Sequence, residues 1–192
     1  MEALLISTGV VALAEIGDKT QLLAFILAAR FKKPLPIILG ILCATVVNHG
    51  LAGALGAWIT TTLSGDTLRW VLGASFIGMA IWTLIPDKIE EEETQVAKHL
   101  GVFGATLITF FLAEMGDKTQ IATVAMAAKF PDPILVVIGT TLGMLIADVP
   151  AVFVGDRFAA KIPMKLVHSI AAGIFAILGI ATLLGAGKSL GF

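Results

Sequence analysis

Charged residues are scarce in this chain. Asp, Glu, Lys and Arg together make up 14% of its 192 residues, whereas about a quarter of a typical soluble domain is charged. The sequence contains several runs of 18 or more mostly apolar residues, and its mean hydropathy is +0.96. Runs of that length predict transmembrane helices. We therefore expect an all-α integral membrane protein that is surrounded by the lipid bilayer.

Three further features are absent from the sequence, and each absence excludes a class of structure or function. Cys43 is the only cysteine, which excludes a disulfide framework within the chain. The sequence has no basic stripe or aromatic platform, so nucleic-acid binding is not expected. It also has no nucleophile–base pair, phosphate loop or cofactor signature. We therefore expect neither an enzyme nor a bound cofactor.

Six membrane spans are expected from the apolar runs. The first and fourth are about 28 residues long, which is about 42 Å of helix against a hydrocarbon core of about 30 Å. Gly17 and Gly116 lie inside these two spans and are natural points for a helix to break. The expected spans are residues 3–30, 35–61, 68–86, 100–129, 133–156 and 166–187.

The second half of the chain repeats the first at a constant offset of 99 residues. Residues 28–31 (AARF) match residues 127–130 (AAKF), and Pro34 matches Pro133. The sequence therefore predicts a first three-helix repeat at 1–86, an acidic linker at 87–99, and a second three-helix repeat at 100–192. Because each repeat crosses the membrane three times, the two repeats must be inverted relative to each other. Many secondary transporters have this architecture, with their binding site at the midplane between the repeats.

The distribution of lysine and arginine predicts the orientation. Eight of these residues fall on one side of the membrane and three on the other, and the richer side is expected to be cytoplasmic. This puts both termini outside and the acidic linker in the cytoplasm. A run of charged residues is usually a solvated loop, and we interpret the linker in this way. The eight residues are Arg30, Lys32, Lys33, Lys88, Lys98, Arg157, Lys161 and Lys165, and the three are Arg69, Lys129 and Lys188.

Two nearly identical charged segments lie within apolar runs: AEIGDKTQ at residues 14–21 and AEMGDKTQ at residues 113–120. Each ionised side chain at the bilayer centre costs at least about 2.5–3.5 kcal/mol. These side chains must therefore face one another or an aqueous cavity. The alternative is that each segment holds its own ion pair, since Glu15 and Lys19, like Glu114 and Lys118, stand four residues apart.

The charges of the two segments suggest what they bind. Four carboxylates and two lysines sum to −2 when all are ionised, a charge that one divalent cation or two protons would neutralise. A cation and protons that compete for the same oxygens are the minimum requirement of an antiporter. Oxygen ligands suit magnesium, calcium and manganese. The candidate metal ligands are Glu15, Asp18, Glu114, Asp117, Thr20, Thr119, Gln21 and Gln120.

A second group of polar residues completes the candidate site as a proton relay or as support for the ligands. His49 and Asp148 occupy equivalent positions in the two repeats, and both lie within expected spans. The lysines could either take part in transport or only balance charge. The members of this group are Lys19, Lys118, Asn48, His49 and Asp148.

The two E-x-G-D-K-T segments, Glu15–Thr20 and Glu114–Thr119, resemble the signature of the Gdt-type cation/proton antiporters, the second cation/calcium exchanger family. The resemblance covers essentially the whole chain. It implies export of manganese, or calcium, from the cytoplasm in exchange for protons. By motif match, Glu15, Asp18, Glu114 and Asp117 would bind the ion, with Thr20 and Thr119 as auxiliary ligands. The short chain is similar to prokaryotic members, in which manganese efflux across the cell (inner) membrane is the expected role.

Other functions remain open from the sequence alone. A three-plus-three exporter of a small organic cation, such as an amino acid, could also place a charged solute beside carboxylates. An accessory membrane subunit could use the charged segments only to hold its helices together. The sequence predicts no oligomeric state. One shared cation site is favoured over two alternating sites.

Overall fold

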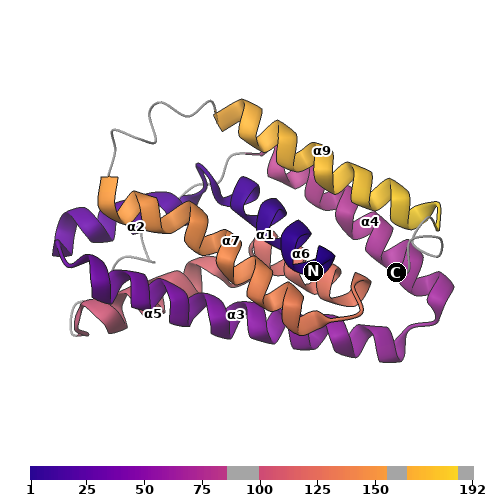
Figure 1. Cartoon of the computed structure of the whole chain (residues 1–192), viewed down its shortest axis with the longest axis horizontal. Coiled ribbons are helices and arrows are strands. Elements are labelled where there is room, and N and C mark those ends of the chain that lie inside the picture. The colour runs from indigo at the N-terminus through magenta and orange to yellow at the C-terminus, as the bar shows by residue number, and fades with distance from the viewer. Residues whose placement is uncertain (86–99, 155–163, 186–192) are drawn as a thin grey trace.

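The computed structural model describes residues 1–85, 100–154 and 164–185, and the regular structure in these ranges is entirely helical. Figure 1 shows the helices lying along one long axis. The acidic linker, expected at residues 87–99, lies outside the described residues. The helices are α1 (Glu2–Glu15), α2 (Lys19–Phe31), α3 (Pro34–Thr62), α4 (Gly65–Thr83), α5 (Val102–Glu114), α6 (Lys118–Lys129), α7 (Pro133–Val154) and α9 (Met164–Leu183).

The first and fourth expected spans are each divided into two helices. The first span becomes α1 and α2, separated at residues 16–18, and the fourth becomes α5 and α6, separated at residues 115–117. The predicted breaks at Gly17 and Gly116 are therefore confirmed. The other four expected spans correspond to single helices, and α7 continues through Pro150.

Local chemistry explains where the longest helices begin. Pro34 occupies the first turn of α3, where its missing N–H has no intrahelical acceptor to lose. Before α7, the Asp132 side chain accepts hydrogen bonds from the amides of Ile134 and Leu135, at 3.0 and 3.1 Å. Such an aspartate satisfies amides that the first turn of a helix leaves without partners.

The lengths of the helices are consistent with membrane insertion. In the described part of the chain, Pro34–Thr62 and Pro133–Phe153 are long and apolar enough to cross a membrane by length and composition. By contrast, α1 has 14 residues and α2 has 13, about 20 Å each at 1.5 Å per residue. Each half of a broken span therefore reaches only part of the way across a 30 Å core.

The two halves of the chain pack against each other. Helix α1 lies along α7, and the corresponding helix of the second half, α5, lies along α3. Likewise α2 packs on α7 and α6 packs on α3, while α4 and α9 form a pair of their own. Figure 1 shows this α4–α9 pair running together along one side of the molecule.

Glycines allow these helices to approach closely. A Cβ atom on Gly143 of α7 would lie 2.7 Å from the carbonyl oxygen of Thr8 in α1. In the other half, a Cβ atom on Gly40 of α3 would lie 2.7 Å from the Cβ atom of Thr106 in α5. Separations below 3.0 Å leave no room for a side chain, so glycine is required at both contacts.

The apolar core has two parts. One part surrounds Phe76 and Phe175, whose rings stack 6.5 Å apart, and draws its buried residues from α1, α4, α6, α7 and α9. The other part includes Leu23, Ile41 and Phe110 and draws its buried residues from α2, α3, α5 and the end of α7. The two breaks lie between these parts. The α4–α9 pair contributes buried residues only to the first part.

Candidate metal site

Each charged segment forms the same tight turn between its two helices. The amide of Asp18 donates to the carbonyl of Glu15 at 3.0 Å, with Ile16 at φ −62°, ψ 114° and Gly17 at φ +85°. These values match a type II β-turn, which requires a positive φ at its third residue. The second segment repeats the hydrogen bond between Asp117 and the carbonyl of Glu114 at 3.1 Å, with positive φ at its glycine. The turn explains why glycine stands at this place in both segments.

The aspartate of each segment begins the following helix. Asp18 has extended backbone angles and its Oδ1 accepts from the amide of Lys19 at 2.9 Å. Asp117 does the same for Lys118 at 2.7 Å. Each carboxylate therefore sits at a helix N-terminus, where the helix dipole stabilises negative charge.

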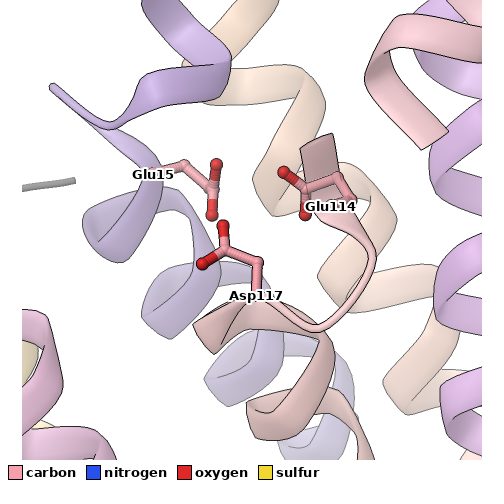
Figure 2. Close-up of side chains that lie close together, drawn as sticks. All are labelled: Glu15, Glu114 and Asp117. Carbon is pink, nitrogen blue, oxygen red and sulfur yellow. The ribbon is translucent and has the colours of Figure 1, made fainter. Parts of the chain in front are cut away.

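Carboxylates of the two segments meet inside the protein. One oxygen each from Glu15, Glu114 and Asp117 lie within 4.8 Å of one another, and Figure 2 shows the three side chains converging from the two breaks. Glu15 and Glu114 are fully buried and Asp117 is 4% exposed. Within the described part of the chain, Oε1 of each glutamate accepts no hydrogen bond. The cluster thus presents buried carboxyl oxygen atoms from both halves of the chain.

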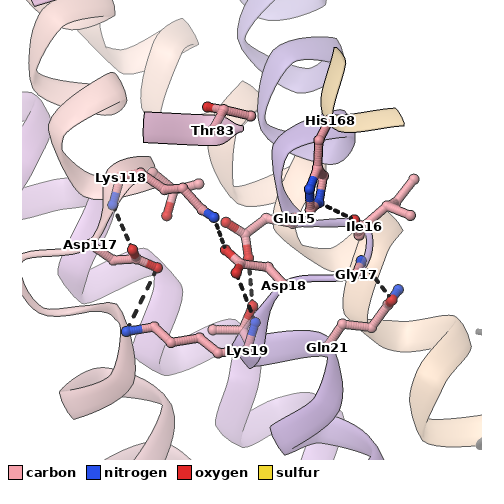
Figure 3. A network of polar contacts seen from close by, with 12 residues as sticks. Glu15, Ile16, Gly17, Asp18, Lys19, Gln21, Thr83, Asp117, Lys118 and His168 are labelled. Atoms are coloured by element: carbon pink, nitrogen blue, oxygen red, sulfur yellow. Dashed lines mark hydrogen bonds and ion pairs between the residues drawn. The ribbon is translucent and has the colours of Figure 1, made fainter. Parts of the chain in front are cut away.

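The lysines pair across the two halves. Lys118 Nζ lies 3.0 Å from Asp18 Oδ2, and Lys19 Nζ lies 3.9 Å from Asp117 Oδ2 (Figure 3). The alternative that each segment pairs its own Glu and Lys is therefore wrong for the described residues. The reason is the turn, which separates Glu15 from Lys19 and removes the continuous helix that four-residue spacing needs.

The two threonines bind the glutamates. Thr20 Oγ1 donates to Glu15 Oε2 at 2.5 Å, and Thr119 Oγ1 donates to Glu114 Oε2 at 2.9 Å. All four side chains are fully buried. Each hydroxyl therefore holds one oxygen of its glutamate, Oε2, in place. The other oxygen, Oε1, accepts no hydrogen bond in the described part of the chain.

The two glutamines cross from one half of the chain to the other. Gln21 Nε2 donates to the carbonyl of Ala147 in α7 at 2.8 Å. Gln120 Nε2 donates to the side-chain oxygen of Asn48 in α3. Asn48, a candidate supporting residue, is thereby brought to the second segment.

The remaining two candidates, His49 and Asp148, lie on the long helices α3 and α7. Asp148 is fully buried and accepts no hydrogen bond within the described residues. His49 is also fully buried and makes no hydrogen bond there. The two residues lie on helices that pack at the site in equivalent ways, α7 on α1 and α3 on α5.

One contact at the site has no signal in the sequence. The ring Nε2 of His168, near the start of α9, lies 3.0 Å from the carbonyl oxygen of Ile16 in the first turn (Figure 3). No motif or repeat in the sequence marks His168, because the contact depends on how α9 packs against α1. It links the α4–α9 pair to the site.

The fold and site together define a class. Buried carboxylates at paired helix breaks, contributed by two halves of an all-helical chain, are typical of proteins that move ions across membranes. Hard oxygen donors fit a divalent cation such as manganese, calcium or magnesium.

Comparison with known proteins identifies the family. The family described as "Divalent cation/proton antiporter GDT1" matches residues 3–91 and 102–189, and the chain belongs to this family. It is therefore a cation transporter and not an enzyme, and the resemblance seen in the two charged segments is confirmed.

Relatives match over nearly the whole chain. A Vibrio cholerae protein named "Putative manganese exporter" is 51% identical over 183 residues, which are 95% of this chain and 90% of that protein. "GDT1-like protein 3" of Oryza sativa is 30% identical over 91% of this chain and 71% of the rice protein. "GDT1-like protein 5" of Arabidopsis thaliana is 27% identical over 90% and 91%. No solved structure matches the chain.

Proposed function

We propose that this protein exports divalent cations, manganese first among them, from the cytoplasm in exchange for protons across the cell (inner) membrane. The proposal is supported by the antiporter family and by the 51% identity to a protein named for manganese export. The observation that carries it is the cluster of Glu15, Glu114 and Asp117, which joins both halves of the chain at one point.

The cation is held by these three carboxylates, with Asp18 as a fourth ligand once its lysine pair loosens. Thr20 and Thr119 are auxiliary ligands or hold the glutamates in place, as their hydrogen bonds suggest. Asp148 supports the site by its negative charge, whereas the pairing of His49 with Asp148 as a proton relay gains no support from their placement. A single cation site is shared by the two repeats.

The net charge of the site explains why export of the cation would be coupled to uptake of protons. Four motif carboxylates and two lysines leave a formal charge of −2. Such a site in a low-dielectric interior is unstable without a compensating cation. Protons taken up as the metal leaves restore neutrality and allow the empty site to return. Export of one divalent cation would then be matched by up to two protons.

The proposed topology has six spans in two inverted repeats, residues 1–86 and 100–192, with both termini outside and the 87–99 linker cytoplasmic. The packing supports it, since α1 on α7 mirrors α5 on α3. Phe76 and Phe175, 99 residues apart, stack on each other as residues on a pseudo-two-fold axis would. The described residues exclude several basic residues used for the orientation: Lys88, Lys98, Arg157, Lys161 and Lys188.

The α4–α9 pair breaks this symmetry, and the break suggests the transport cycle. Helix α4 packs on α6 and α9 packs on α1, but among the described residues the symmetry-related packings of α4 on α5 and of α9 on α2 are not comparably formed. The pair thus covers the α1–α6 end, which the topology places outside. With this proposed topology, we assign the arrangement described here to a state closed to the outside; moving the pair toward α2 and α5 would produce the opposite state.

Transport in proteoliposomes tests the function. Purified protein is reconstituted, a pH gradient is imposed, and uptake of manganese, calcium and a panel of radiolabelled amino acids is measured. We expect manganese flux that follows the proton gradient and reverses when the gradient is reversed. Equal calcium flux would widen the substrate to calcium, and amino-acid flux without metal flux would replace the proposal with the organic-cation exporter.

A further inference from the structure

We propose that Gln21 and Gln120 are positioning residues that lock each β-turn of the site to the opposite half of the chain. The inference rests on the proposed function, because the object being positioned is the cation site. Neither residue belongs to the six-residue signature, and as oxygen donors both are expected to be ligands. The hydrogen bonds around them support a different role.

The oxygen atom of each amide is already engaged by the turn. The amide of Gly17 donates to Gln21 Oε1 at 2.9 Å, and the amide of Gly116 donates to Gln120 Oε1 at 2.7 Å. Each glutamine is the third residue of its helix, the position from which a glutamine side chain commonly reaches back to an amide before the helix. The break interrupts the hydrogen-bond pattern of the helix, and each glutamine supplies an acceptor for the glycine amide in place of a helical carbonyl.

The nitrogen atom of each amide reaches the other half of the chain. Gln21 Nε2 donates to the carbonyl of Ala147 in α7, and Gln120 Nε2 donates to Asn48 in α3. Both acceptors lie on long, continuous helices of the opposite repeat. Each glutamine thus connects a turn, which is easily deformed, to a rigid helix.

This connection fixes the carboxylates of the site. Glu15 and Asp18 are the first and last residues of the first turn, and Gly17 lies between them. Holding the amide of Gly17 therefore limits the positions of both carboxylates. The same holds for Glu114 and Asp117 around Gly116.

The two possible roles of glutamine respond oppositely to substitution by glutamate. Glutamate keeps an acceptor for the glycine amide but loses the donor to the facing helix. As a ligand it would bind a hard divalent cation at least as well as glutamine. If the glutamine is a positioning residue, glutamate could not hold the turn against the facing helix, and cation binding would weaken. Methionine, of similar length, loses both hydrogen bonds.

The experiment compares Gln120→Glu, Gln120→Met, Asn48→Leu and the double variant Asn48→Leu/Gln120→Met in reconstituted protein. Loss of partners that orient metal ligands typically weakens metal affinity about 10–100-fold. We expect each single variant to raise the KM for manganese within this range, with a smaller change in kcat. Both Gln120→Met and Asn48→Leu remove the hydrogen bond between Gln120 and Asn48, and each also removes one bond of its own, to Gly116 or to the carbonyl of Phe111. Because one bond is shared, the rise in KM of the double variant should be smaller than the product of the two single effects.

The matched control is Asn48→Leu/Gln21→Met. Gln21 bonds to a backbone carbonyl and not to Asn48, so the two effects on KM should multiply in this pair. A KM for Gln120→Glu equal to or lower than that of the wild type would overturn the inference in favour of a ligand. Multiplying effects in the Asn48→Leu/Gln120→Met pair would also overturn it.

A second measurement does not depend on transport. Hydrogen–deuterium exchange of the peptide that covers residues 113–120 reports on the amide of Gly116. We expect faster exchange in Gln120→Met than in the wild type, while the peptide around residues 14–21 stays unchanged. Equal exchange at Gly116 would contradict the inference. If the amide of Gly116 exchanges more slowly in the wild type than in Gln120→Met but the wild type moves no metal, only the proposed function would be contradicted.

Discussion

Lys118 Nζ lies 3.0 Å from Asp18 Oδ2, although the two residues belong to different halves of the chain. Lys118 is fully buried, whereas its counterpart Lys19 is 17% exposed and lies 3.9 Å from Asp117. The two symmetric ion pairs are therefore unequal in the state described by the structure. Lys118, the buried lysine, begins α6, the helix on which α4 packs.

The first prediction concerns this inequality. Lys118→Met leaves the buried Asp18 carboxylate without its lysine and should lower the free energy of unfolding by about 3–5 kcal/mol. Lys19→Met should have a smaller effect, because its pair is longer and partly exposed. Thermal unfolding in detergent measures both. Adding Asp18→Asn to Lys118→Met should recover part of the loss, and equal effects of the two lysine variants would contradict the assignment.

The second prediction concerns the turn. Gly116 has φ +78° and open space around the position of a Cβ atom. Gly116→Ala should therefore cost only the left-handed backbone conformation, about 1–2 kcal/mol, while Gly116→Asn should cost less. Gly9, inside α1 and also in open space, is the matched control, and Gly9→Ala should be neutral or stabilising by up to about 1 kcal/mol. Equal losses in both alanine variants would argue against the turn.

The third prediction concerns the movement of the α4–α9 pair. Lys129 Nζ in α6 donates to Thr182 Oγ1 in α9 at 2.8 Å. The residues 99 positions earlier are Arg30 in α2 and Thr83 in α4. Arg30 is exposed, and Thr83 donates to the carbonyl of Met79 within its own helix. In the opposite state these two residues should meet.

Paired cysteines test this movement in a Cys43→Ser background. A short cross-linker that forms a disulfide bond with each cysteine should join Lys129→Cys/Thr182→Cys in the state described by the structure and Arg30→Cys/Thr83→Cys in the opposite state. Either cross-link should stop manganese flux until a reductant is added. Arg30→Cys/Thr182→Cys is the control and should not react. Full transport with the first pair cross-linked would show that the α4–α9 pair does not need to move.

The helix breaks could be predicted from the sequence because their causes are local. A span of about 28 residues is too long for the membrane, and glycine is the residue that tolerates a positive φ. The placement of Gly17 and Gly116 in the middle of charged segments therefore indicates a break without knowledge of the fold. The identity of the family could be predicted for a similar reason, because its signature is two short continuous segments.

The pairing of charges could not be predicted in this way. Four-residue spacing favours Glu15 with Lys19 only while the helix continues, and the turn interrupts it. The actual partners are about 100 residues away in the sequence. The contact of His168 with the carbonyl of Ile16 shows the same limit, since it joins residues 152 positions apart.

The most direct test of the account is the number of manganese ions that one chain binds. Titration of purified protein by calorimetry should give one ion per chain, and Glu15→Gln or Glu114→Gln alone should remove that binding while each variant remains folded. This result is expected if both repeats form one site. Two ions per chain, with each variant removing only one of them, would contradict the shared site.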